Sequence, residues 1–151
     1  MKRVIVTGSS RGIGRAVALD LARAGYDPVV HCVRNLAAAE SVAAETRALG
    51  GSGRVLAFDV SDRSAAKAAL DAYVETEGAP YGVVLNAGIA ADAAFPALED
   101  DQWDRVIRTD LDGFYNVLKP LVLPMVQARA HGRIVAISSI YGVIGNRGQT
   151  N

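Results

Sequence analysis

Residues 4–14 read Val4-Ile5-Val6-Thr7-Gly8-Ser9-Ser10-Arg11-Gly12-Ile13-Gly14. A short β-branched run ends here in a cluster of glycines, and apolar residues then recur at helical spacing up to Gly25, at Ile13, Val17 and Leu21. The stretch predicts a strand, a glycine-rich turn and a helix. Such a turn lets the backbone approach a pyrophosphate, which the free N–H groups and the positive dipole end of the helix attract.

The same order of elements repeats along the chain. Apolar runs predict four further buried strands at residues 29–33, 54–58, 83–85 and 134–137. The helices between them are indicated by a stripe of Ala39, Val42, Ala43 and Leu49, by Ser61 as an N-cap, and by a long helical stretch over 101–130 that contains Pro120 and Pro124. Alternating strands and helices favour a parallel sheet covered on both faces. We expect one α/β domain over residues 1–151, with a doubly wound parallel sheet of the Rossmann type.

Length and composition are consistent with a single domain. The chain has 151 residues, half of them hydrophobic, which suffice for one core but not for two ordinary domains. Basic and acidic residues both number 16, so no net charge attracts a nucleic acid. No apolar run approaches the roughly 20 residues of a membrane span, and the single cysteine, Cys32, can form no intrachain disulfide. We expect a soluble cytoplasmic protein that binds neither nucleic acid nor membrane.

Two motifs follow predicted strands, where a doubly wound sheet binds its ligand. Residues 7–14 fit the pattern T-G-x-x-x-G-x-G, and Asn86-Ala87-Gly88 follows the fourth predicted strand. Both resemble signatures of the short-chain dehydrogenase/reductase family. The resemblance extends through Asp59-Val60 and Ser139 to the tail Gly145–Asn151, and so covers essentially the whole chain. The tail is most similar to the 3-ketoacyl reductases of that family.

The resemblance implies a dinucleotide site along the strand ends. The glycines would shape the pyrophosphate turn, Asp59 and Val60 would border the adenine, and Asn86 would lie beside the nicotinamide ribose. The candidate cofactor-binding residues are Gly8, Ser10, Arg11, Gly12, Ile13, Gly14, Arg34, Asp59, Val60, Asn86, Ala87 and Gly88. Taken alone, Asp59 could instead cap a helix and Asn86 could form an Asx-turn.

An arginine, and no acid, follows the second predicted strand. NAD sites of this type have a carboxylate there that binds the ribose 2′-hydroxyl, whereas a 2′-phosphate calls for arginine. The sequence reads Val33-Arg34-Asn35 at this point and has Arg11 in the glycine turn. Two guanidinium groups near the adenosine ribose favour NADP(H), although each arginine alone is also consistent with a solvated surface residue.

The resemblance also implies the chemistry. Hydride would pass between the nicotinamide and a ketone carbon, a tyrosine activated by a lysine would protonate the oxygen, and Ser139 would orient it. By the family spacing, the tyrosine of the Y-x-x-x-K motif is expected immediately after Asn151, with the family's C-terminal strands and helices also beyond this chain. Asp110 stands where the family usually has an asparagine tied through water to the lysine. Because aspartate keeps the acceptor and loses the donor, Asp110 is either part of such a relay or a helix-surface acid.

Three functions remain open on this basis. The first is an NADP-dependent reductase of 3-ketoacyl thioesters held on acyl-carrier protein, which the resemblance implies to be a homo-tetramer. The second is a catalytically inactive short form that acts as a nucleotide-binding or structural subunit. The third is a reductase of another small ketone or alcohol. We expect no metal site, because neither histidine has other potential metal ligands near it. The two are His31, in an apolar strand, and His131, in a turn.

Overall fold

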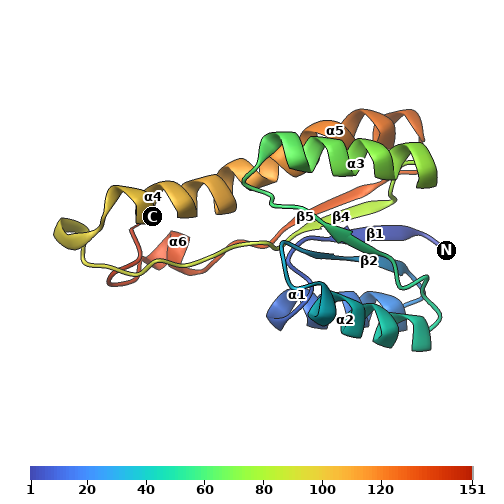
Figure 1. Cartoon of the computed structure of the whole chain (residues 1–151), viewed down its shortest axis with the longest axis horizontal. Helices are drawn as coiled ribbons and strands as arrows, with labels where there is room; N and C mark the ends of the chain where they lie inside the picture. The colour runs from blue at the N-terminus through green and yellow to red at the C-terminus, as the bar shows by residue number, and fades with distance from the viewer. Residues whose placement is uncertain (151) are drawn as a thin grey trace.

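The computed structural model describes residues 1–150, in which five parallel strands form one sheet between two layers of helices (Figure 1). Asn151, the last residue of the tail motif, lies outside the described residues. The sheet has the order β3-β2-β1-β4-β5 and consists of β1 (Arg3–Val6), β2 (Asp27–Cys32), β3 (Val55–Ala57), β4 (Gly82–Leu85) and β5 (Arg133–Ala136). The strand order reverses between β1 and β4, which is where a doubly wound sheet binds ligands. The predicted fold class is confirmed.

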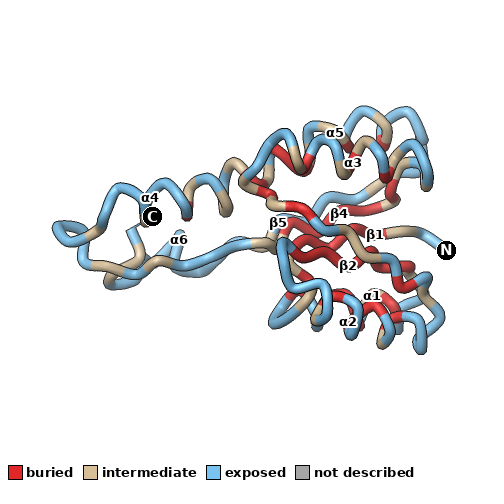
Figure 2. Tube along the Cα trace, in the orientation of Figure 1, coloured by how far each residue is buried: buried red, intermediate tan, exposed pale blue. Residues whose placement is uncertain are grey.

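The helices cover both faces of the sheet. α1 (Gly12–Arg23) and α2 (Leu36–Ala48) lie on one face, and α3 (Arg63–Glu77) and α5 (Gly113–Gln127) lie on the other (Figure 1). A lobe protrudes beyond the carboxyl ends of the strands and contains η1 (Phe95–Ala97), α4 (Asp100–Val106), the π-helix η2 (Ile107–Asp112) and α6 (Tyr141–Ile144). Figure 2 shows that burial is concentrated in the sheet and the helix faces against it, while most of the lobe is exposed.

Neighbouring residues of β1 supply two separate cores, because successive side chains of a strand point to opposite faces. Ile5 packs with residues of α3 and α5, including Leu70 and Leu121. Val4 and Val6 pack on the other face with residues of α1 and α2. Every residue of β2 is buried, as expected for a strand covered on both sides. These cores fix the positions of the strand ends.

Several positions predicted from the sequence are wrong in detail. Ser61 does not cap α3; Asp62 does, since its Oδ1 accepts hydrogen bonds from the backbone N–H groups of Ser64 and Ala65 at 2.9 and 3.0 Å. Three residues assigned to buried runs are exposed: Ile13, Val33 and Leu49. Each lies in the first turn of a helix or just past the end of an element, where the sheet no longer covers it.

The long helix expected over 101–130 is present as three consecutive elements, α4, η2 and α5. It begins at Asp100, after a capping box formed by Glu99 and Gln102, and α5 ends at Gln127. The π-helical turns of η2 lie between α4 and α5, and α5 is the part of the helix that packs on the sheet. Within residues 1–150, no helix combines the length and the apolar character that crossing a membrane requires.

Candidate cofactor-binding and active site

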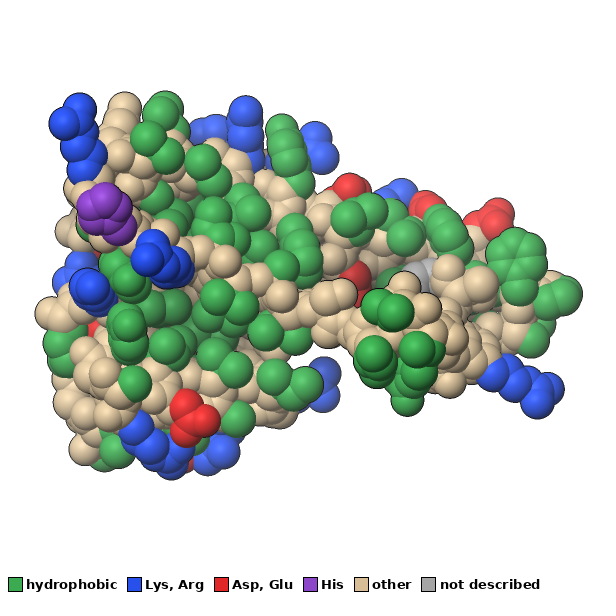
Figure 3. Space-filling view, turned by 180° about the vertical axis from the view of Figure 1, so that it is seen from behind, with side chains coloured by type: hydrophobic (Ala, Val, Ile, Leu, Met, Phe, Trp, Pro, Cys, Tyr) green, Lys and Arg blue, Asp and Glu red, His purple; other side chains and the backbone are tan. Residues whose placement is uncertain are grey.

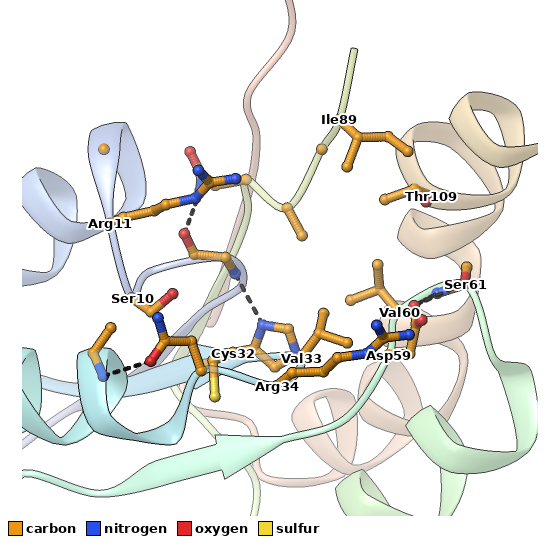
Figure 4. A pocket seen from close by; sticks show the side chains of 18 of the residues that line it. Ser10, Arg11, Cys32, Val33, Arg34, Asp59, Val60, Ser61, Ile89 and Thr109 are labelled. Carbon is orange, nitrogen blue, oxygen red and sulfur yellow. Dashed lines mark hydrogen bonds between the residues drawn. The ribbon is translucent and has the colours of Figure 1, made fainter. Parts of the chain in front are cut away.

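A cleft of about 900 Å³ opens at the carboxyl ends of β1, β2 and β4 (Figure 4). Of the candidate cofactor-binding residues, all except Gly14 line it: Gly8, Ser10, Arg11, Gly12, Ile13, Arg34, Asp59, Val60, Asn86, Ala87 and Gly88. The lining also contains residues that were not among the cofactor-binding candidates, among them His31, Cys32, Asn35, Ser61, Ile89, Arg105, Arg108 and Thr109. The structure thus brings together residues from five separate segments of the chain.

The glycines of the turn have different tasks. Gly8 has a φ of +65°, and a Cβ there would lie 2.9 Å from the Cα of Ala87. A Cβ on Gly14 would collide with Nδ2 of Asn86 and lie 2.6 Å from the carbonyl oxygen of Gly8. Gly12 has a φ of +55° and no atom near its Cβ position. Gly14 therefore acts behind the turn, where it permits close packing, while Gly12 leaves the cleft side open.

Thr7 and Asn86 join the glycine turn to the segment after β4. Oγ1 of Thr7 accepts hydrogen bonds from the backbone N–H groups of Asn86 and Ala87 at 2.9 and 3.0 Å. The side-chain amide of Asn86 donates to the carbonyl oxygens of Thr7 at 2.9 Å and Gly8 at 3.4 Å. The Asx-turn considered for Asn86 is therefore not the arrangement observed. Its side chain links two strand ends across the point where the strand order reverses.

His31 also lines the cleft, although no sequence motif marks it. Its ring is fully buried, its Nδ1 accepts a hydrogen bond from the backbone N–H of Gly8 at 2.9 Å, and Nε2 lies 3.0 Å from the carbonyl oxygen of Phe58. Because Nδ1 is an acceptor, the proton is on Nε2 and is donated to Phe58. Burial lowers the pKa of His31 to about 4, against opposing effects of the Phe58 carbonyl and Asp59. Its only sequence signal is a polar ring inside an apolar strand.

The N-terminus of α1 is suited to binding an anion. Arg11 is the N-cap, its backbone is extended, and its side chain makes no capping hydrogen bond, so the first N–H groups of the helix have no side-chain partner. Figure 4 shows Arg11 on the α1 side of the cleft and Arg34 extending from the end of β2 toward Asp59. Among the described residues that line the cleft, arginines outnumber acids, since Asp59 is the single acid.

The carboxylate of Asp59 is held within its own loop. Its Oδ1 accepts hydrogen bonds from the backbone N–H and the Oγ of Ser61 at 2.9 and 2.7 Å. The N-cap of the following helix is Asp62, so Asp59 does not cap α3. Asp59 and Val60 consequently form the wall of the cleft that lies opposite Ser10 and Arg11 in Figure 4.

The two candidate catalytic residues lie outside the lining of this cleft. Ser139 follows β5, is exposed, and its Oγ accepts a hydrogen bond from the backbone N–H of Tyr141 at 3.2 Å. Asp110 lies in η2, and its Oδ1 accepts a hydrogen bond from the backbone N–H of Ile89 at 2.9 Å. Burial raises the pKa of Asp110, which is only partly offset by that bond. The half-buried Asp110 therefore holds the segment after Gly88 in place through a hydrogen bond and is not a free helix-surface acid.

A tyrosine and a lysine with Y-x-x-x-K spacing occur in α5, at Tyr115 and Lys119. Both side chains are exposed, and neither residue lines the cleft. The ring of Tyr115 lies under the guanidinium of Arg63 in α3, at 5.2 Å from the ring centroid. Tyr115 therefore packs against α3, and this pair does not substitute for a catalytic tyrosine and lysine at the cleft.

Comparison with known proteins agrees with the geometry. The family described as short chain dehydrogenase matches residues 2–151. The chain belongs to the short-chain dehydrogenase family. Its relatives in this family include a 3-oxoacyl-(acyl-carrier-protein) reductase of Aggregatibacter actinomycetemcomitans, 61% identical over 98% of this chain and 61% of the relative. A reductase of the same name from Pseudomonas aeruginosa is 40% identical over 99% of this chain and 60% of the relative. The chain thus spans about three fifths of the length of these family members.

A solved structure from the family has the same fold. It is a gluconate 5-dehydrogenase from Burkholderia cenocepacia, in complex with NADP and tartrate, with a TM-score of 0.91 and 35% sequence identity. The similarity covers 99% of this chain and 58% of that one. Membership of the short-chain dehydrogenase family agrees with the motifs at residues 7–14 and 86–88, which are now seen to meet at one edge of the sheet.

Proposed function

We propose that the protein is an NADP-dependent reductase of 3-oxoacyl thioesters carried on acyl-carrier protein. The observation that carries this proposal is the cleft itself, which combines a glycine turn, an uncapped helix N-terminus and Arg34 at the end of β2. The names of the relatives from Aggregatibacter and Pseudomonas support the substrate class. The NADP bound to the Burkholderia dehydrogenase supports the cofactor.

The lining of the cleft fits such a nucleotide. Gly8, Gly12 and the N-terminus of α1 would hold the pyrophosphate, because they offer close backbone approach and free N–H groups. Arg11 and Arg34 would bind the 2′-phosphate. Asp59 and Val60 would border the adenine, and the segment Asn86–Gly88 would lie beside the nicotinamide ribose.

NADPH, when bound, supplies the hydride for the ketone. Ser139 would orient the ketone oxygen, since its Oγ accepts a hydrogen bond from the backbone of Tyr141 and keeps its own proton to donate. Such a hydrogen bond makes the carbonyl carbon more electrophilic. Asp110 would hold the segment after β4 in place through the N–H of Ile89. The proton donor that the family resemblance implies is the tyrosine expected after Asn151, so we assign no proton donor within residues 1–150.

The outer face of α5 and β5 is the proposed subunit contact of a homo-oligomer, a tetramer by family resemblance, in the cytoplasm. A groove of about 580 Å³ lies there, lined by Val122, Met125, Val126, Arg129, His131, Gly132 and Ile134. Figure 3 shows hydrophobic side chains gathered over the body of the molecule on its back face. Exposed apolar side chains of this extent are typical of interaction surfaces.

Steady-state kinetics on the protein expressed from its complete reading frame would test the proposal. The expected result is NADPH oxidation with a 3-oxoacyl thioester, at a kcat/KM at least about 100-fold above that for a keto-sugar acid, a difference of roughly 2.7 kcal/mol in transition-state binding. The keto-sugar acid is the competing substrate because the solved relative is a gluconate 5-dehydrogenase. A preference for the sugar acid would replace the proposed substrate class.

A further inference from the structure

The buried ring of His31 connects two walls of the cleft. Its Nδ1 holds the backbone N–H of Gly8 in the glycine turn, and its Nε2–H is bonded to the carbonyl of Phe58, which directly precedes Asp59 and Val60. Ser9 strengthens the first link, because its N–H donates to the His31 carbonyl at 3.0 Å and its Oγ accepts from the His31 N–H at 2.9 Å. The ring packs edge-to-face on Phe58, with centroids 4.3 Å apart.

We infer that His31 is a positioning residue for the dinucleotide, setting the distance between the pyrophosphate turn and the adenine wall through its neutral, Nε2-protonated ring. The inference rests on the proposed cofactor and extends it to a side chain that need not touch the cofactor. Gly8 has a left-handed backbone conformation, and its N–H donates a hydrogen bond to the ring. Without this acceptor, the Gly8 N–H would lose its partner, and the turn would be free to adopt other conformations.

The ring must be neutral for this task, since an imidazolium has no acceptor for the Gly8 N–H. Its surroundings favour the neutral form, because the ring is fully buried and burial lowers the pKa of His31. The negative charge of Asp59 raises this pKa, but by less than burial lowers it. The neighbouring thiol of Cys32, also buried, has a pKa raised by burial and stays uncharged as well. The hydrogen bonds of His31 therefore persist at neutral pH.

Three substitutions distinguish the contributions of the two hydrogen bonds that the ring makes. Asparagine places its Oδ1 at the same number of bonds from Cα as Nδ1, so His31→Asn keeps an acceptor for Gly8. Glutamine places its Nε2 at the position corresponding to the ring Nε2, so His31→Gln keeps the donor to Phe58 and loses the acceptor. Phenylalanine fills the volume and loses both. Leu121→Val, on the buried side of α5, is the control for a loss of packing that does not involve the cleft.

The test is the dissociation constant of NADPH, measured by fluorescence titration on the protein from its complete reading frame, together with kcat and the KM for NADPH. We expect His31→Phe and His31→Gln to raise the dissociation constant by about tenfold or more, equivalent to one buried hydrogen bond. His31→Asn should restore it to within about threefold of the wild type. The KM for NADPH should rise with the dissociation constant, while kcat at saturating NADPH stays within about twofold.

Thermal unfolding of each variant shows whether it is folded, and Leu121→Val shows how lost stability alone affects binding. Affinity for NADPH in His31→Phe equal to that of the wild type would overturn the inference, as would equal affinities of the Asn and Phe variants. A wild-type protein that does not bind NADPH would instead overturn the proposed cofactor. The two failures are therefore distinguishable.

Discussion

At the scale of single residues, we expect the charge that follows β2 to determine which nucleotide the cleft accepts. Arg34 lines the cleft, and no acid stands beside it in Val33-Arg34-Asn35. Replacing Arg34 with aspartate removes a partner for the 2′-phosphate, repels that group and supplies an acceptor for a ribose 2′-hydroxyl. We expect Arg34→Asp to lower the ratio of kcat/KM for NADPH to that for NADH by at least about tenfold, roughly 1.4 kcal/mol.

The matched control is Arg23→Asp, because Arg23 pairs with Asp20 on the exposed side of α1 and does not line the cleft. This substitution should leave the cofactor ratio unchanged. An unchanged ratio in Arg34→Asp would remove Arg34 from the 2′-phosphate site and leave Arg11 as the remaining candidate.

Ser139 and Ser138 offer a second comparison of adjacent residues. Ser139 is the residue that matches the serine of the family, and Ser138 directly precedes it. We expect Ser139→Ala to lower kcat at least about 100-fold, the size of effect for a group that acts on the reacting oxygen. Ser138→Ala should stay within severalfold of the wild type, and the dissociation constant of NADPH should change in neither. Equal kcat values for the two variants would contradict the assignment.

At the scale of elements, the glycine turn and α1 allow a prediction about stability. A Cβ on Gly14 would meet the Asn86 side chain and the Gly8 backbone, whereas a Cβ on Gly12 would meet nothing and only strain the backbone. We expect Gly12→Ala to lower the free energy of unfolding by about 1–2 kcal/mol, and Gly14→Ala to lower it by more, because backbone atoms cannot move aside as a flexible side chain can. Chemical denaturation measures both. A smaller loss for Gly14→Ala would mean that the turn is packed less closely than described.

The order of the elements could be predicted because each buried strand is a continuous apolar run followed by a glycine or a helical pattern. The exact first and last residues of the elements could not be predicted. Asp62 and Ser61 are both good N-caps, and only the path of the chain after Asp59 decides between them. The wider turns of η2 have no sequence signal in Ile107–Asp112.

The lining of the cleft was predictable where a motif marks it, as at residues 7–14 and 86–88. His31 was not, because its role arises from pairing β2 with β1 and β3, which brings its ring between Gly8 and Phe58. The hydrogen bond from Ile89 to Asp110 likewise joins residues 21 positions apart in the chain. Such contacts depend on the packed sheet and not on local sequence.

At the scale of the whole molecule, the face formed by β5 and α5 predicts association. All four residues of β5 are exposed, and Ile134, which is 48% accessible, lies on the side of the sheet that carries α5. Val122, Leu123 and Val126 extend this apolar surface along α5. A strand edge with exposed apolar side chains pairs readily with other chains. We expect the 151-residue polypeptide, purified by itself, to form oligomers or aggregates in size-exclusion chromatography with light scattering.

A charge on this face should reduce the association, so Ile134→Lys should shift the polypeptide toward the monomer. Ile144→Lys is the matched control, because Ile144 is also exposed but lies in α6 of the protruding lobe. If the unsubstituted polypeptide were a monodisperse 15.8 kDa monomer, the prediction would be wrong, and this apolar face would be stable in contact with solvent.

The most direct test of the proposed function follows the hydride itself. The protein from its complete reading frame is incubated with NADPH deuterated at nicotinamide C4 and a 3-oxoacyl thioester on acyl-carrier protein, and the product is analysed by mass spectrometry. One deuterium at C3 of a 3-hydroxyacyl product is the expected result for one of the two labelled C4 faces of the cofactor. Binding of NADPH without transfer of deuterium to C3 from either face would contradict the account.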